Sequence, residues 1–237
     1  MVRRDVVPAA RINPSGMSPA LLARRGRVAL WLGLIALLPP GVVAADTWPH
    51  RGFAIDDTRV RKAADLEEVR QAIRQQIDIV AAVGLSADMM RFFQGVPLVV
   101  IPSDAIPRSS PGLYRPGSRD VQLTNRITTI GPRPVLLHEL LHAYHAQRLP
   151  DGFKHRAILA FFEKARPSPA FAANSHMMQN PGEFFACAAT TYLHGVTAQE
   201  PLQRAKLKEA LPEFFAYLEK LFGPTAGTYS PSVTGQK

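Results

Sequence analysis

The sequence offers no covalent or repeated feature that could fix its fold. One of its 237 residues is a cysteine, Cys187, so a disulfide within the chain is excluded. Cys187 stands between alanines in an apolar stretch and lacks the flanking residues of cysteine peptidases, which favours a small buried residue over a catalytic thiol. No internal repeat is present. The fold must therefore be held together by one hydrophobic core.

An apolar run long enough to span a membrane is also missing. The stretch at 28–38 has 11 residues, whereas a spanning helix needs about 20. Arginines precede this stretch, and Val43, Ala44 and Ala45 follow it, as in a cleavable leader. We predict a signal peptide with an upstream extension before Met17 at residues 1–45, cleaved near Ala45. A retained N-terminal anchor is the alternative.

The charge has no strong concentration of one sign. The chain carries 28 basic and 19 acidic residues, for a net charge of +9. Residues 1–45 hold six arginines and one aspartate, so the remainder has 22 basic and 18 acidic residues and a net charge of +4. Basic clusters with interleaved aromatic residues, which are typical of nucleic-acid binding, are absent. We expect an exported protein, periplasmic or secreted, with no nucleic-acid partner and no stable membrane span after cleavage.

Residues 46–224 suit one domain, followed by a flexible tail at 225–237. The fold class expected is α+β and mostly helical, with a small sheet beside the helix around residue 140. A strand at 120–124 is expected to form a cleft wall, where an extended peptide could add. From hydrophobic periodicity and turn residues we expect helices at 56–83, 134–147, 154–164, 181–193 and 201–222, a strand at 96–101 and paired strands within 113–124.

The most informative motif is the HExxH segment from His138 to His142. On a helix, residues four apart lie on the same face, so His138 and His142 can direct two imidazoles at one cation. Glu139 then lies beside the open coordination position of that cation. This arrangement suits a catalytic Zn²⁺ ion with a carboxylate as general base. Surrounding leucines indicate a buried helix and disfavour two solvated surface histidines.

A third protein ligand is needed for a catalytic zinc. The longer metzincin motif fails here, because His145 occupies its glycine position and Arg148 its final histidine position. His145 lies about 10 Å along the same helix from His138, too far to share the metal with both other histidines. Two interpretations of His145 stay open: a residue supporting the ligands and a packed core histidine.

Glu183, in the segment Asn180-Pro181-Gly182-Glu183, is the candidate third ligand. A carboxylate in the first turn of a second helix can reach the histidine face if the two helices cross closely. The alternative is purely structural: Asn180 resembles a helix N-cap, and Glu183 its capping-box partner.

With these two motifs, HELLH and NPGEFFA, the chain resembles the zincin metallopeptidases with a glutamate ligand. It is most similar to anthrax-lethal-factor-like peptidases and to uncharacterised exported bacterial proteins with an HELLHAYH segment. The resemblance covers about residues 112–194. It implies a zincin-like fold with one Zn²⁺ ion held by His138, His142 and Glu183. It further implies a peptide or protein substrate, and hydrolysis by a zinc-activated water with Glu139 as general base.

The chain departs from lethal-factor-like enzymes at one catalytic position. Those enzymes carry a tyrosine shortly before the ligand glutamate, and its hydroxyl stabilises the oxyanion; no tyrosine is present at 175–179. His176 could donate that hydrogen bond instead, or it could be an exposed loop residue. The runner-up function is a non-enzymatic exported zinc-binding protein, for which the carboxylate of Glu139 would have no use.

Overall fold

The computed structural model describes residues 46–106, 110–195 and 203–225. Within these ranges the fold contains seven α-helices and one sheet of five strands, which confirms the expected α+β class with a small sheet. The predicted signal region and residues 226–237 of the predicted tail lie outside the described residues. Among the helices that are described, none is both long and apolar enough to cross a membrane.

The sheet has the strand order β1-β2-β3-β5-β4. β3 pairs in parallel with both β2 and β5, whereas β1–β2 and β4–β5 are antiparallel pairs. The β4–β5 pair confirms the paired strands expected within 113–124. The strands are β1 Thr47–His50, β2 Phe53–Asp56, β3 Leu98–Ile101, β4 Gly112–Arg115 and β5 Asp120–Thr124.

The expectation that residues 120–124 form the wall of the cleft is wrong. β5 lies between β3 and β4, so its backbone is paired on both sides. β4 is the edge strand, and its residues Gly112, Leu113 and Tyr114 line the cleft described below. Alternation within 120–124 identified the strand, but the strand order depends on contacts between distant segments.

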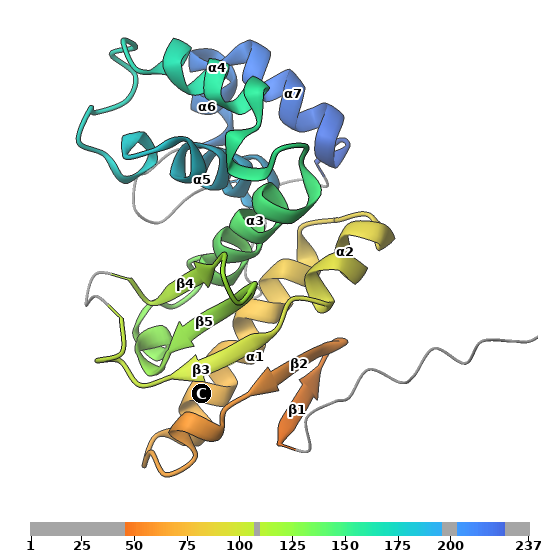
Figure 1. Cartoon of the computed structure of the whole chain (residues 1–237), viewed down its shortest axis with the longest axis vertical. Helices are drawn as coiled ribbons and strands as arrows, with labels where there is room; N and C mark the ends of the chain where they lie inside the picture. Colours follow the sequence, from red (N-terminus) through yellow and green to blue (C-terminus); the bar gives the residue numbers. More distant parts are fainter. Residues whose placement is uncertain (1–45, 107–109, 196–202, 226–237) are drawn as a thin grey trace, which may run out of the picture. The chain divides into compact units, whose positions relative to one another are not determined.

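The helix that carries the HExxH motif, α3, lies between the sheet and the remaining C-terminal helices, with α1 and α2 on the sheet side (Figure 1). The four leucines of α3 are fully buried, as expected of a helix packed on both sides: Leu136, Leu137, Leu140 and Leu141. The helices are α1 Leu66–Ala82, α2 Ala87–Gln94, α3 Val135–Arg148, α4 Arg156–Ala165, α5 Pro181–His194, α6 Arg204–Ala210 and α7 Pro212–Phe222.

The first helix begins ten residues later than periodicity predicts. Residues 58–60 form a short 3₁₀ helix, η1, before α1 starts at Leu66. The buried carboxylate of Asp57 accepts hydrogen bonds from Arg61 and Arg70, which fixes this bend. From Leu66 onward, α1 buries an apolar face that includes Val69, Ile73, Ile77 and Val80.

A buried glutamine on α1 fixes the start of α3. Gln76 is 1% exposed, and its Nε2 donates to the carbonyl of Arg133 at 2.8 Å. Its Oε1 accepts from the backbone N–H of Leu136 at 3.1 Å. Pro134, the N-cap residue of α3, provides no side-chain cap. Gln76 therefore satisfies a backbone donor that a local cap would otherwise satisfy.

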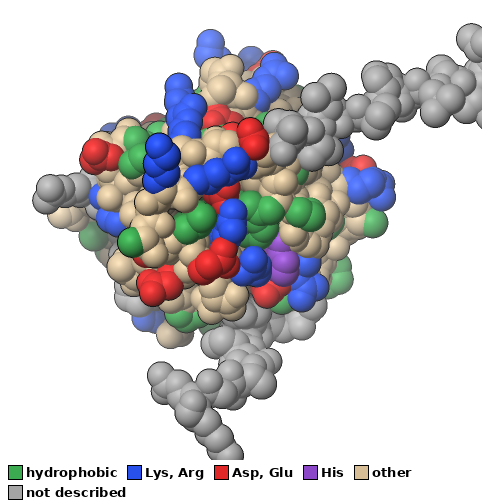
Figure 2. Space-filling model, turned by 90° about the horizontal axis from the view of Figure 1, so that it is seen from below, with side chains coloured by type: hydrophobic (Ala, Val, Ile, Leu, Met, Phe, Trp, Pro, Cys, Tyr) green, Lys and Arg blue, Asp and Glu red, His purple; other side chains and the backbone are tan. Residues whose placement is uncertain are grey.

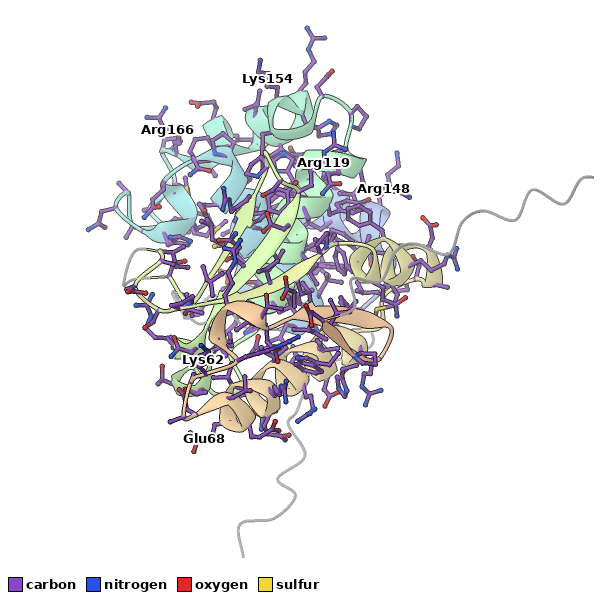
Figure 3. All side chains as sticks on the ribbon, turned by 60° about the horizontal axis from the view of Figure 1, so that its bottom comes forward. Lys62, Glu68, Arg119, Arg148, Lys154 and Arg166 are labelled. Carbon is purple, nitrogen blue, oxygen red and sulfur yellow. The ribbon has the colours of Figure 1, made fainter. Side chains whose placement is uncertain are left out.

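The surface carries charges of both signs. On the face shown in Figure 2, basic and acidic side chains are interspersed among apolar ones. Charged residues such as Lys62, Glu68, Lys154 and Arg166 project outward from the periphery of the fold (Figure 3).

Candidate metal centre

Two helices supply the central residues of the site. His138 and His142 lie four residues apart on α3, and their rings face each other edge to face with centroids 4.7 Å apart. Glu183 lies in the first turn of α5, which packs against α3 through contacts such as His145 with Phe185. This crossing brings the start of α5 to the histidine face of α3.

The polar atoms of these three residues converge. Oε2 of Glu183 lies 3.1 Å from Nε2 of His138 and 3.3 Å from Nε2 of His142. The two histidine Nε2 atoms are 3.1 Å apart. Three potential ligands from two helices therefore form a nearly equilateral triangle, in which each residue contributes one atom.

This triangle fits a metal ion of the size of zinc. Ligands at 2.0–2.1 Å from a tetrahedral ion lie about 3.3 Å from one another. The three observed separations, 3.1, 3.1 and 3.3 Å, match that edge length. Two imidazoles and one carboxylate suit Zn²⁺ and other first-row transition metals better than Ca²⁺ or Mg²⁺, which prefer oxygen ligands only.

Glu183 has a capped backbone N–H and, at the same time, a side chain that converges with the two α3 histidines. The side chain of Asn180 accepts a hydrogen bond from the backbone N–H of Glu183 at 3.0 Å, and Pro181 occupies the first helical position. Asn180 is thus the N-cap that the sequence indicates. The carboxylate of Glu183 is directed at the histidines, so the structural alternative accounts for its main chain and not for its side chain.

The charge state of Glu183 follows from this environment. Burial on its own would raise the pKa of the carboxyl group, but hydrogen bonds with His138, His142 and His176 hold the pKa well below its usual range. Glu183 is therefore an anion at any physiological pH, as a carboxylate ligand must be.

Glu139 lies beside the triangle in a different environment. It is 7% exposed, and its Oε2 accepts a hydrogen bond from the backbone N–H of Tyr114 on β4 at 2.8 Å. Burial raises the pKa of Glu139 above its ordinary value, although His138 and the Tyr114 N–H oppose that shift. The strand therefore fixes the orientation of a carboxylate whose proton affinity is increased.

The close approach of β4 to α3 depends on a glycine. A Cβ atom at Gly112 would lie 2.9 Å from Cγ1 of Val135 and 3.1 Å from Cγ of Glu139, both shorter than ordinary contacts. No local sequence signal distinguishes Gly112 from a turn glycine, so its role could not be predicted from the sequence.

His176 belongs to the same cluster. It begins the short 3₁₀ helix η4, His176–Met178, and its Nε2 lies 2.8 Å from Oε2 of Glu183. Its ring centroid is 5.8 Å from that of His138. The interpretation of His176 as an exposed loop residue is therefore wrong, and its role as an oxyanion donor stays a prediction.

Cys187 also lies at this site, which the sequence did not predict. Cys187 lies one turn after Glu183 on α5, and its sulfur belongs to a group with ligand atoms of His138, His176 and Glu183 that all lie within 4.8 Å of one another. It is 6% exposed, in agreement with a small buried residue. The four-residue spacing from Glu183 was the available signal for its position.

His145 is a core residue. It is fully buried between the rings of Phe153 and Phe185, with centroid distances of 5.0 and 4.8 Å. Among the described residues, neither of its ring nitrogens has a hydrogen-bond partner. Burial lowers the pKa of His145 to about 3, so the ring is neutral. The packed-core interpretation of His145 is confirmed.

The cluster opens into a cleft of about 480 Å³. β4 forms one wall, the start of α5 and His176 form another, and α3 lies at the base with His138, Glu139 and His142.

Comparisons with known proteins give a distant structural likeness. No protein family matches the chain, and no curated protein matches it. Among solved structures, the chain is similar to the Pro-Pro endopeptidase PPEP-2 from Paenibacillus alvei, with 18% sequence identity and a TM-score of 0.47. That alignment covers 66% of this chain and 92% of the other. A likeness at this distance does not define a family.

Proposed function

We propose that the chain is an exported zinc-dependent peptidase of the zincin type with a glutamate ligand. The observation that carries the proposal is the triangle of His138 Nε2, His142 Nε2 and Glu183 Oε2, with edges of 3.1–3.3 Å. These three residues would hold one Zn²⁺ ion. When bound, the ion supplies Lewis acidity toward a carbonyl oxygen and lowers the pKa of water.

Glu139 is the general base in this proposal. Its carboxylate would take the proton of the water molecule that attacks the scissile carbonyl, and would later deliver it to the leaving amine. The raised pKa of Glu139 suits both halves of this transfer, since a base with a very low pKa binds protons too weakly. The hydrogen bond from the Tyr114 N–H occupies one of its oxygens and thereby fixes the direction of the other.

His176 would donate a hydrogen bond to the carbonyl oxygen as it becomes negatively charged. Its Nε2 lies 2.8 Å from Oε2 of Glu183, so the ring is already held beside the proposed ligands. A donor that is fixed near the reacting carbon needs little reorganisation during the reaction, and such donors are worth about 10²–10³ in rate.

The substrate would be an extended peptide or protein segment paired with β4. Because β4 is the edge of the sheet, its outer side can accept another strand at main-chain groups other than the Tyr114 N–H, which already donates to Glu139. Strand addition is a common mode of peptide recognition. Main-chain pairing would place the scissile bond above His138, Glu139 and His142 at the base of the cleft.

Export is part of the same proposal and rests on residues 1–45 alone. The basic start, the short apolar stretch and the small residues up to Ala45 support a cleaved signal peptide and a periplasmic or secreted protein. Mass spectrometry of protein from the native envelope or medium should find an N-terminus close to Asp46. An intact Met17 start in the membrane fraction would instead favour the anchored alternative.

A second candidate is a non-enzymatic exported zinc-binding protein. The observation in its favour is that His176 reaches the same oxygen of Glu183 as the two α3 histidines. Four protein side chains could then close the coordination sphere, as in structural zinc sites, which leave no position for water.

The Glu139→Gln variant separates the two functions. The amide oxygen of the substituted side chain can still accept the Tyr114 N–H, so the variant should fold and retain zinc, measured by metal analysis of the purified protein. Cleavage of a mixed peptide library should fall about 10²–10⁴-fold. Equal cleavage by variant and parent would show that Glu139 is no general base. Stoichiometric zinc without any cleavage by the parent would favour the non-enzymatic candidate.

A further inference from the structure

The charges that line the cleft are divided between its centre and one end. Among the described lining residues, the acidic ones are Glu139 and Glu183, both at the central cluster. The lysine and arginine residues of the lining are Arg126 and Arg133 alone. Both arginines come from the segment 125–134 that connects β5 with α3.

The position of this segment along β4 follows from the strand register. Gly112 pairs with Leu123, and the backbone N–H of Thr124 donates to the carbonyl of Pro111 at 2.9 Å. The chain after Thr124 therefore continues past the N-terminal end of β4. Arg126 accordingly reaches the carbonyl of Ser110, with Nη2 at 3.1 Å.

Arg133 lies just before α3 in the chain, at the same end of the cleft. The side chain of Val135, two residues later, lies beside Gly112, the first residue of β4. One turn further along α3, Glu139 accepts a hydrogen bond from the N–H of Tyr114. α3 and β4 therefore run in the same direction from this end of the cleft, and Arg133 lies at this end, just before α3 begins.

The other end of the cleft is aromatic. Tyr114 and Phe153 both line it, with ring centroids 6.5 Å apart. The cleft thus has a cationic end near Ser110 and an aromatic end near Phe153, with the candidate metal centre between them.

The arginines are held in place by the protein backbone. Nε of Arg133 donates to the carbonyl of Ile130 at 3.0 Å, and Nη2 of Arg126 donates to the carbonyl of Ser110. The carbonyls of Gly131 and Arg133 accept hydrogen bonds from the buried Gln76, at 3.3 and 2.8 Å. A guanidinium on a braced loop loses less conformational entropy when it binds an anion.

Guanidinium groups bind carboxylates through paired, charge-assisted hydrogen bonds. A peptide paired antiparallel to β4, the slightly more stable pairing, has its C-terminal part at the N-terminal end of β4. We propose that Arg126 and Arg133 form a subsite for a carboxylate in the part of the substrate that follows the scissile bond. The carboxylate belongs to an Asp or Glu side chain or to the C-terminus of the peptide. This inference rests on the proposed peptidase function.

Four sets of fluorogenic peptides with a common core test the subsite. One set has Asp or Glu after the scissile bond and an amidated C-terminus, and the second is neutral with a free C-terminal carboxylate. The third is neutral and amidated, and the fourth carries Asp or Glu only before the scissile bond. The parent should cleave the first or second set on the order of tenfold faster than the third and fourth, and whichever set is preferred identifies the source of the carboxylate.

Arg126→Gln and Arg133→Gln should remove this preference through a higher KM for the preferred set. The matched control is Arg166→Gln, which removes the same charge from an outward-facing residue that does not line the cleft (Figure 3). Equal cleavage of all four sets, preference for the fourth set, or unchanged selectivity in both arginine variants would overturn the proposal.

A binding measurement separates this inference from the peptidase proposal. Fluorescence polarisation with the same peptides on the Glu139→Gln protein requires no turnover. Carboxylate-dependent binding that both arginine variants abolish would support the subsite even if the parent cleaves none of the peptides. Cleavage by the parent without any carboxylate dependence would leave the peptidase intact and reject the subsite.

Discussion

Asn180 accepts a hydrogen bond from the backbone N–H of Glu183 at 3.0 Å, while the carboxylate of Glu183 faces His138 and His142. One residue thus provides the capped main chain of α5 and a side chain for the candidate metal centre. The two roles can be separated by mutating each partner.

Asn180→Ala removes the cap and leaves the carboxylate in place. We expect the free energy of unfolding to fall by about 0.5–2 kcal/mol, with zinc stoichiometry unchanged. Glu183→Ala should abolish or strongly weaken zinc binding in a protein that is still folded. Equilibrium unfolding together with metal analysis measures both. Full zinc retention by Glu183→Ala would remove Glu183 from the ligand set.

Gly112→Ala tests the approach of β4 to the general base. The added Cβ would meet Val135 and Glu139 at 2.9 and 3.1 Å and displace the carboxylate. We expect zinc retention with a loss of peptide cleavage on the order of 10- to 100-fold. Gly117→Ala is the matched control, since a Cβ there has no neighbour within 4 Å. Parent-like cleavage by Gly112→Ala would show that this contact does not position Glu139.

His145 should make the metal-free protein sensitive to acid. Its pKa is lowered from 6.5 to about 3 by burial, so the native ring is neutral while the unfolded ring binds a proton below pH 6.5. The contribution of His145 to stability is therefore complete above pH 6.5 and is lost as the pH falls toward 3, by at most about 1.4 kcal/mol per unit.

Urea unfolding of the metal-free protein at about pH 7.5 and about pH 5 measures this dependence. His145→Phe should reduce the loss of stability between the two pH values, because Phe fills a site already lined by Phe153 and Phe185 and does not titrate. An identical loss in parent and variant would assign the acid sensitivity to other groups.

Cys187 should lie outside the ligand set. The group that contains its sulfur spans up to 4.8 Å, which is wide for ligands that share one ion at about 2.0–2.3 Å. The histidine–glutamate triangle spans 3.1–3.3 Å. Cobalt-substituted protein should therefore lack a thiolate charge-transfer band, and Cys187→Ala should retain one equivalent of zinc. A band that disappears in Cys187→Ala would identify a thiolate ligand.

Local patterns predicted the parts of the site that depend on one helix. The four-residue spacing of His138 and His142 places them together on any α-helix. Asn180-Pro181 indicates the start of α5, so Glu183 could be assigned to a first turn. The convergence of Glu183 with α3 was a hypothesis about how two helices cross, and the structure has that crossing.

Features that depend on contacts between distant segments were not predictable. The order of β3, β5 and β4 is set by packing of the whole sheet, which is why the cleft wall was assigned to β5 and not to β4. The role of Gly112 depends on a helix that begins more than twenty residues later. The delayed start of α1 depends on the ion pairs that the buried Asp57 makes with Arg61 and Arg70, and nothing in the local sequence distinguishes Asp57 from an ordinary polar helix residue.

The hydrogen bonds of Gln76 have a consequence for how small a working fragment could be. Every residue of the proposed ligand set lies between His138 and Glu183, yet the first turn of α3 is held by a side chain about sixty residues upstream. A fragment that begins after β3 would contain all the ligands but would lack this brace. Zinc binding by the intact chain would then also depend on correct folding of its N-terminal half. Truncation from the N-terminus would lower the metal affinity without removing a single ligand.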